Sequence, residues 1–289
     1  MTFRAAALTD ADIVRARKLV PRAFARPARE HLRSWIGWTV FAALVVYCLI
    51  RFDFSPVRIW DGIHELGLIT GLMFPPSTGG NFDLFLLGIL ETLGMAFLGT
   101  LIGGIVAFPL SFLAAKNIVP AWIVHFGARR VFDVLRGVDV MIWALVFVRA
   151  IGLGPLAGIM AIAISDIGTL SKLFSEAIEN IDRDQMDGIK AAGANRAKTV
   201  RFGVVPQVLP VMLSFALYMF ESNTRSATIL GIVGAGGIGL LLADRIRTHV
   251  WDQACMIIIM ILVTVYAIDF ISKKLREHLI GGAGKNALN

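Results

Sequence analysis

Long stretches without a single charged residue constrain this chain more than any other feature. Five such runs cover residues 34–50, 92–115, 202–220, 226–243 and 253–268, and two shorter runs at 140–148 and 150–165 flank Arg149. A helix needs about 20 apolar residues to cross a bilayer core, and most of these runs reach that length with their flanks. The runs predict an all-α, polytopic helical membrane protein.

The composition supports a membrane protein over a soluble one. Of the 289 residues, 56% are hydrophobic and 17% are charged, against about 45–50% apolar and about 25% charged in soluble domains. The alternative is a soluble protein with buried helices, but such helices seldom repeat at this length. Cys48 and Cys255 lie inside apolar runs and are expected to be packing residues. The five histidines lack metal-ligand spacing, so we expect no metal site and no cofactor bound by this chain.

Basic residues set the predicted topology, because Lys and Arg accumulate on the cytoplasmic side of membrane helices. The basic N-terminal arm is expected in the cytoplasm. We expect about six transmembrane helices, at 35–50, 84–115 (kinked at Pro109), 138–150, 153–170, 203–220 and 252–272. Segments 51–81 and 221–251 are then outside, and 116–137 and 172–201 are inside.

This topology divides the chain into four parts. Residues 1–34 are the cytoplasmic arm, and 35–83 hold the first helix and an outer loop. Residues 84–275 form the core, which includes the cytoplasmic loop 172–205. Residues 276–289 are the cytoplasmic tail. Gly99 and Gly103, four residues apart in the second helix, are expected to let helices approach closely.

The stretch from Gly231 to Leu240 contains the spacing G-x-G-x-x-G at Gly234, Gly236 and Gly239. A dinucleotide-binding turn would need a soluble βαβ unit, and this chain has no room for one. We therefore expect residues 226–243 to form a glycine-rich re-entrant segment that lines a wet cavity, because glycine permits tight turns at membrane depth.

The polar loop after the fourth helix has an amphipathic pattern. Glu176, Glu179 and Asp182 alternate with apolar residues at helical spacing, and a second short helix is expected from Gln185 to Ala192. Gly193 fits a helix C-cap in the left-handed conformation. Two amphipathic helices favour docking to a partner over a solvated linker.

This loop resembles the E-A-A-x-x-x-G-(nine residues)-I-x-L-P motif of permease subunits of bacterial ABC importers. Asp187-Gly188-Ile189 stands in place of E-A-A, Gly193 and Pro206 match, and Gly203 and Val205 take the I and L positions. The stretches 141–158, 172–182, 203–210 and 220–239 resemble phosphonate-type permeases, a family with the type I importer fold found in methionine-importer permeases.

The resemblance implies a multi-pass permease subunit of the bacterial plasma membrane and no enzyme. It implies a homodimer, two cytoplasmic ATP-binding subunits that carry the ATP and Mg²⁺, and an extracytoplasmic phosphonate-binding protein. The second short helix would be the coupling helix that contacts the ATPase. The coupling residues expected from this resemblance are Gln185, Asp187, Gly188, Ile189, Ala191, Ala192, Gly193 and Arg196.

An anionic substrate needs cations or backbone N–H groups along its path. The candidate path residues are Arg149, Asp166, Glu221, Asn223, Arg225, Gly234, Gly236 and Gly237. Ionisable residues at membrane depth usually pair, so we expect Glu221 to pair with Arg225 and Asp166 with Arg149. The alternative is that these are structural ion pairs with no role in the path.

Two other functions stay open from the sequence. A secondary transporter or channel for a small anion would work without an ATPase. An integral-membrane enzyme would need clustered His, Cys or carboxylate side chains, which the sequence does not offer. For an importer, alkylphosphonate, phosphite and phosphate are all possible substrates. The net charge of +7 suggests contact with anionic lipid headgroups and not with nucleic acid.

Overall fold

A computed structural model describes residues 14–15, 18–19 and 28–286, and within these ranges it contains helices and turns but no strand. The predicted all-α class is confirmed. Most of the basic N-terminal arm lies outside the described residues. The chain divides into two compact units, Met1–Leu68 and Ile69–Asn289.

The first unit holds α3 (Ala28–Arg51) and most of α4 (Pro56–Leu72). The helix predicted at 35–50 lies within α3. The helix α4 was not predicted, because residues 51–81 read as an outer loop. None of its residues is buried within the chain.

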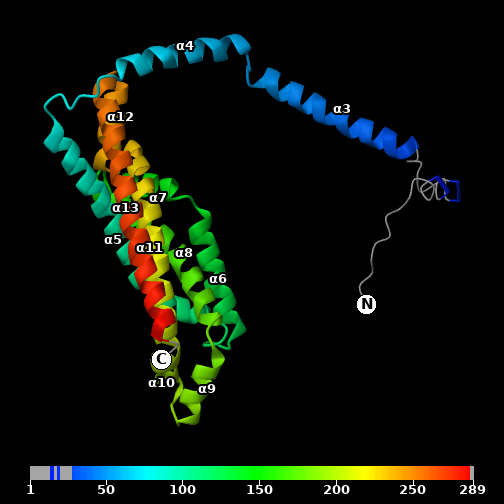
Figure 1. Ribbon diagram of the computed structural model, residues 1–289, viewed down its shortest axis with the longest axis vertical. Coiled ribbons are helices and arrows are strands. Elements are labelled where there is room, and N and C mark those ends of the chain that lie inside the picture. The colour runs from blue at the N-terminus through cyan, green and yellow to red at the C-terminus, as the bar shows by residue number, and fades with distance from the viewer. Residues whose placement is uncertain (1–13, 16–17, 20–27, 287–289) are drawn as a thin grey trace. The chain divides into compact units, whose positions relative to one another are not determined.

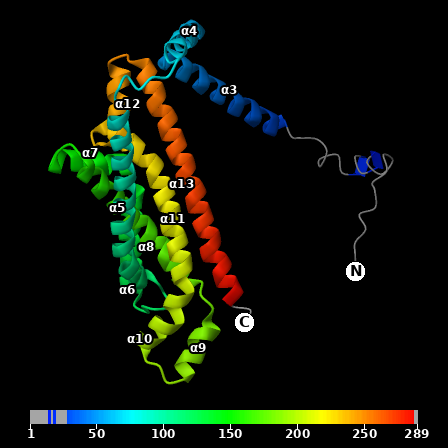
Figure 2. The same ribbon diagram turned by 60° about the vertical axis from the view of Figure 1, so that its left-hand side comes forward.

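The second unit is built on four long helices that run side by side, α5 (Phe82–Ala114), α8 (Pro155–Glu179), α11 (Val205–Leu230) and α13 (Trp251–Asn286) (Figures 1 and 2). At 1.5 Å per residue, α5 is about 50 Å long. The shorter elements are α6 (Trp122–Gly137), α7 (Val140–Ile151), α9 (Arg183–Ala191), α10 (Arg196–Thr199), the π-helix η1 (Val200–Val204), the 3-10 turn η2 (Gly231–Val233) and α12 (Gly237–Arg247).

Five helical stretches among the described residues are long and apolar enough to cross a membrane: Ser34–Arg51, Phe82–Ala114, Pro155–Glu179, Arg196–Val233 and Trp251–Leu279. A sixth predicted span corresponds to α7, which is apolar but has only 12 residues. Pro109 lies inside α5, and the helix continues through it.

Glycines bring α5 and α8 into close contact. A Cβ atom on Gly99 would lie 2.6 Å from Ile162, and one on Gly103 would lie 2.6 Å from the Cβ of Asp166. Real Cβ atoms essentially never lie so close, so a larger residue at either position would force the helices to shift. The role predicted for this glycine pair is confirmed.

Three apolar clusters fill the second unit along its length. The first, near the start of α5, includes Phe85, Ile89, Ile238 and Ile257. The second packs Met95 and Ile162 against Leu230 and Ala235. The third, at the end where α9 lies, includes Leu170, Phe174, Ile178, Val204, Val208 and Met186. Where these clusters lie in the membrane, close van der Waals packing holds the helices together, because lipid tails are as apolar as the side chains themselves.

Several predicted boundaries are wrong. Residues 116–137 are not simply a loop, since α6 begins at Trp122 and buries Phe132. The helix α8 runs on to Glu179, so the first amphipathic helix predicted in the cytoplasmic loop is its last turns. The fifth helix runs on through Glu221 and Arg225 to Leu230, so these residues are not on an outer loop.

The glycine-rich segment does not enter and leave at the same end. The turn after α11 lies beside Thr92, and α12 then runs toward the end of the unit where α5 begins, packing Ile238 against Gly88. Figure 1 shows α12 reaching that end before α13 turns back. The segment predicted to be re-entrant therefore contains the turn between α11 and α12, two helices that continue in the same direction.

Candidate coupling and translocation sites

The coupling helix predicted from Gln185 to Ala192 is α9 (Arg183–Ala191). Asp182 caps its N-terminus, with its carboxylate accepting from the backbone N–H of Asp184 at 3.0 Å. Gly193 ends it with φ +83°, the left-handed conformation expected of a C-cap glycine. Asp187 and Lys190 form an exposed ion pair of 2.8 Å on its surface.

One face of α9 is attached to the rest of the chain. Met186 is buried in the third apolar cluster. A Cβ on Gly203 would lie 3.2 Å from the Cδ1 of Ile189, so the glycine allows α9 to sit close to η1. A larger residue here, such as the isoleucine usual at this motif position, would press on Ile189 of α9. Of the other predicted coupling residues, those with side chains open to solvent are Gln185, Asp187, Ala191, Ala192 and Arg196, and Gly188 and Gly193 are also exposed.

Side chains that the sequence did not single out as coupling residues form hydrogen bonds around the end of α8 and the start of α9. The Nη2 of Arg129 donates to Glu179 at 2.7 Å, and the backbone N–H of Lys116 donates to the same carboxylate at 2.8 Å. Gln207 donates to the carbonyl of Gly203 at 2.6 Å and accepts from the N–H of Asp182 at 3.2 Å. The first two contacts join α6 and the segment after α5 to the end of α8. The other two join the N-cap of α9 and η1 to α11.

A second ion pair joins α6 to α8. Lys172 donates to Asp133 at 2.7 Å. This hydrogen bond, together with the positive charges of Lys172, Arg130 and Arg136, holds the pKa of the Asp133 carboxyl below its usual value, although burial acts in the opposite direction. The carboxylate form of Asp133 is therefore favoured in the folded protein.

The candidate path residues Asp166 and Asn223 meet in the interior. The amide of Asn223 donates to the Asp166 carboxylate at 2.6 Å and to the Thr100 hydroxyl at 2.8 Å. Asp166 is fully buried within the single chain. The predicted pair of Asp166 with Arg149 is wrong, because the partner of Asp166 comes from α11.

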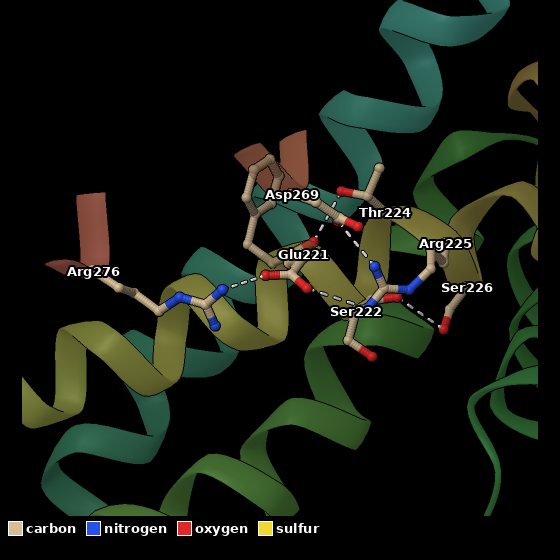
Figure 3. Close-up of polar contacts among 8 residues, drawn as sticks. Glu221, Ser222, Thr224, Arg225, Ser226, Asp269 and Arg276 are labelled. Atoms are coloured by element: carbon tan, nitrogen blue, oxygen red, sulfur yellow. Dashed lines mark hydrogen bonds and ion pairs between the residues drawn. The ribbon is translucent and has the colours of Figure 1, made fainter. Parts of the chain in front are cut away.

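Glu221 and Arg225 form the predicted pair, at 3.5 Å, but it belongs to a larger set of contacts. Arg225 also donates to Asp269 at 2.9 Å, and Arg276 donates to Glu221 at 2.6 Å. We call these four residues the α11–α13 ion-pair network (Figure 3). Two cations and two carboxylates balance, so Arg225 is not a free cation.

Arg149 differs from the cations of the long helices that form ion pairs, such as Lys172 and Arg225. It lies in the last turn of α7 and is exposed, and the ion pairs of the described residues do not include it. Gly152 and Gly154 follow it, and the N–H of Gly154 donates to the carbonyl of Gly234 at 3.1 Å. The end of α7 therefore adjoins the glycine turn.

The glycine turn is built from residues with positive φ, at Gly234, Gly236 and Gly237. The N–H of Gly237 donates to Glu91 at 3.1 Å, and that of Ile238 donates to the Thr92 hydroxyl at 2.9 Å. These first N–H groups of α12 already have partners from α5. The described residues contain no cluster of His, Cys, Asp or Glu that could hold a metal ion.

Comparison with known protein families identifies the family to which this chain belongs. Residues 107–280 match the family described as the binding-protein-dependent transport system inner membrane component. The chain belongs to this family. It is an inner-membrane permease component, and its relatives are permease proteins and not enzymes.

Several relatives of this permease are named for phosphorus compounds. It is 37% identical to HtxC of Stutzerimonas stutzeri, a permease protein named for phosphite transport, over 89% of each chain. It is 32% identical to the phosphite transport system permease protein PtxC of the same species, over 86% of this chain and 94% of that one. The phosphate-import permease protein PhnE of Mycolicibacterium smegmatis is 36% identical over 88% of this chain but only 48% of its own length.

Solved structures support the fold. An inward-facing structure of the methionine ABC transporter MetNI matches 68% of this chain and 96% of that chain, with a TM-score of 0.58 and 21% identity. The type I importer permease fold implied by the coupling-loop motif is confirmed. The expectations of a transporter working without an ATPase and of a membrane enzyme are not supported by these relatives.

Proposed function

We propose that this permease is one of two identical chains in an ATP-driven importer for phosphonate or a related phosphorus oxyanion. The observation that carries the proposal is α9, a short capped helix that packs on the long helices with one face and leaves the other exposed. The relatives of the chain are named for phosphite and phosphate transport. Two cytoplasmic subunits would bind ATP and Mg²⁺, and a binding protein would deliver the substrate.

The open face of α9 is the surface we assign to the ATP-binding subunit. A groove of about 1030 Å³ lies beside it, and its lining includes Pro120, Lys190 and Arg196. An ATPase element that enters this groove would contact both α9 and the segment before α6. With α9 in the cytoplasm, the N-terminus and the basic C-terminal tail would lie there too, as the distribution of Lys and Arg requires.

Arg149 and the glycine turn are our candidates for the path itself. An oxyanion needs a cation that is not already neutralised, and Arg149 meets this condition while Arg225 does not. Gly234, Gly236 and Gly237 adjoin the end of α7 and keep the backbone there free of side chains. Asp166 and Asn223 are buried within one chain, which fits a packing role better than a place on the path.

Uptake of labelled methylphosphonate into proteoliposomes, with the ATP-binding subunit and the binding protein present, tests this proposal. Arg149→Gln should raise the half-saturating concentration severalfold, and Arg149→Lys should restore much of the loss. Arg225→Gln is the matched control, expected to lower thermal stability and leave the half-saturating concentration near that of the wild type. Normal uptake kinetics in Arg149→Gln would remove Arg149 from the path.

A further inference from the structure

The α11–α13 ion-pair network has an inner half and an outer half. The side chains of Glu221 and Arg276 are 14% and 24% exposed, and Arg276 also lies 6.0 Å from the ring centre of Tyr218. Arg225 and Asp269 form the outer half and remain 44% and 41% exposed. Figure 3 shows these two side chains reaching toward each other from α11 and α13.

This outer half lies at membrane depth. Arg225 is two residues after Asn223, which is bonded to Thr100 near the middle of α5. Asp269 lies within the apolar stretch Trp251–Leu279 of α13, and Arg225 lies within Arg196–Val233. Neither residue is at the end of its apolar stretch, since α11 continues from Arg225 to Leu230 and the stretch in α13 continues from Asp269 to Leu279.

Lipid cannot cover such a pair without a large cost. Charged side chains at bilayer depth face protein or a water-filled cavity almost without exception, because the hydrocarbon cannot solvate them. A face with an Arg and an Asp each more than one-third exposed is therefore incomplete in a single chain. In the membrane, polar groups from another source must cover the exposed parts of Arg225 and Asp269.

We propose that a second copy of this chain covers the face, with Arg225 of each copy opposite Asp269 of the partner subunit across a two-fold axis. A two-fold interface places the same patch on both sides, so the patch must complement itself. One exposed cation beside one exposed carboxylate meets that condition. A neutral patch of this kind offers no net attraction for a substrate anion. The inference rests on the proposed pair of permease chains and names the surface that joins them.

Exchanging the two charges tests the interface without breaking the pair inside the chain. In R225D/D269R the two residues can still bond each other, and Arg276 still bonds Glu221. The exchange loses only the 3.5 Å contact between Arg225 and Glu221. When wild-type and R225D/D269R chains are co-expressed with different tags in lipid nanodiscs, each should copurify with its own kind. Mixed pairs should be about tenfold rarer than chance, because like charges would face each other. Mixing at the chance ratio would overturn the proposal.

An exposed ion pair elsewhere supplies the matched control. Arg58 and Asp53 pair at 3.3 Å with side chains 70% and 78% exposed, and D53R/R58D should mix freely with the wild type. Thermal melting of each chain checks that it folds. Failure of two wild-type chains to copurify would also overturn this interface. The uptake assay would still test the importer function separately, since it does not depend on which residues join the chains.

Discussion

The amide of Asn223 on α11 donates to the carboxylate of Asp166 on α8 at 2.6 Å, in the interior of the second unit. The same amide donates to Thr100 on α5. Three of the four long helices are thus joined by one side chain, at the level where Gly103 lets α5 approach α8. This contact fixes the relative register of the helices that α9 would have to move.

Replacing the shared side chain should loosen this junction. Asn223→Ala leaves the Asp166 carboxylate and the Thr100 hydroxyl without their donor, and a buried polar group left unpaired costs about 1–3 kcal/mol. We expect a clearly lower melting temperature in nanodiscs. Ser222→Ala on the same helix is the control and should melt close to the wild type. An unchanged melting temperature for Asn223→Ala would contradict the role given to this contact.

The two adjacent glycines of α5 should respond differently to the same substitution. A Cβ on Gly103 would lie 2.6 Å from that of Asp166, whereas one on Gly104 would lie 3.8 Å from the nearest atom of Leu170. Gly103→Ala should destabilise by about 1–3 kcal/mol through overpacking. Gly104→Ala should be nearly neutral. Thermal melting of both variants checks this. If Gly103→Ala proved as mild as Gly104→Ala, the helices could separate without cost.

The end of α9, the proposed coupling helix, depends on a left-handed residue. Gly193 has φ +83° and open space around it, so Gly193→Ala adds backbone strain of about 1–2 kcal/mol without a clash. We expect weaker substrate stimulation of the partner's ATPase, with basal hydrolysis maintained. Gly193→Asn should restore most of the stimulation, because asparagine tolerates this conformation. Equal behaviour of the two variants would argue against backbone strain as the cause.

The Asp133–Lys172 pair should make stability depend on pH. Because the pKa of Asp133 is lowered in the folded chain from its usual 3.8, the stabilisation is present above that value and is lost as the pH falls through it. The melting temperature of the wild type should exceed that of Asp133→Asn near neutral pH, and the difference should shrink below about pH 4. Lys172→Met should make the difference smaller but not abolish it, because Arg130 still pairs with Asp133 at 3.3 Å. A difference that persists in acid would contradict this cause.

Much of the fold could be predicted because lipid imposes a simple rule on sequence. Uncharged runs of sufficient length predicted the membrane-spanning helices, and Gly193 predicted the residue at which α9 ends. The boundaries failed where a helix continues through charged residues. Glu221 and Arg225 seemed to end a span, yet α11 continues because Asp269 and Arg276, more than 40 residues later, neutralise them.

The candidate sites could be predicted only as far as local spacing reaches. Glu221 and Arg225 are four residues apart on one helix, so their pairing was visible in the sequence. The partner of Asp166 is 57 residues away, and nothing in the spacing distinguishes Asn223 from Arg149 as that partner. The helix α6 could have been found, since Trp122 and Phe126 lie one turn apart and their rings stack at 5.0 Å.

ATPase activity of the reconstituted importer tests the central claim most directly. The permease in nanodiscs would be combined with its ATP-binding subunit and binding protein, and hydrolysis measured with methylphosphonate, phosphite, phosphate or no substrate. We predict stimulation by a phosphorus oxyanion that requires all three proteins and is lost when α9 is altered by Gly193→Pro. An ATPase that does not associate with the permease, or that responds equally with and without the permease, would contradict the account.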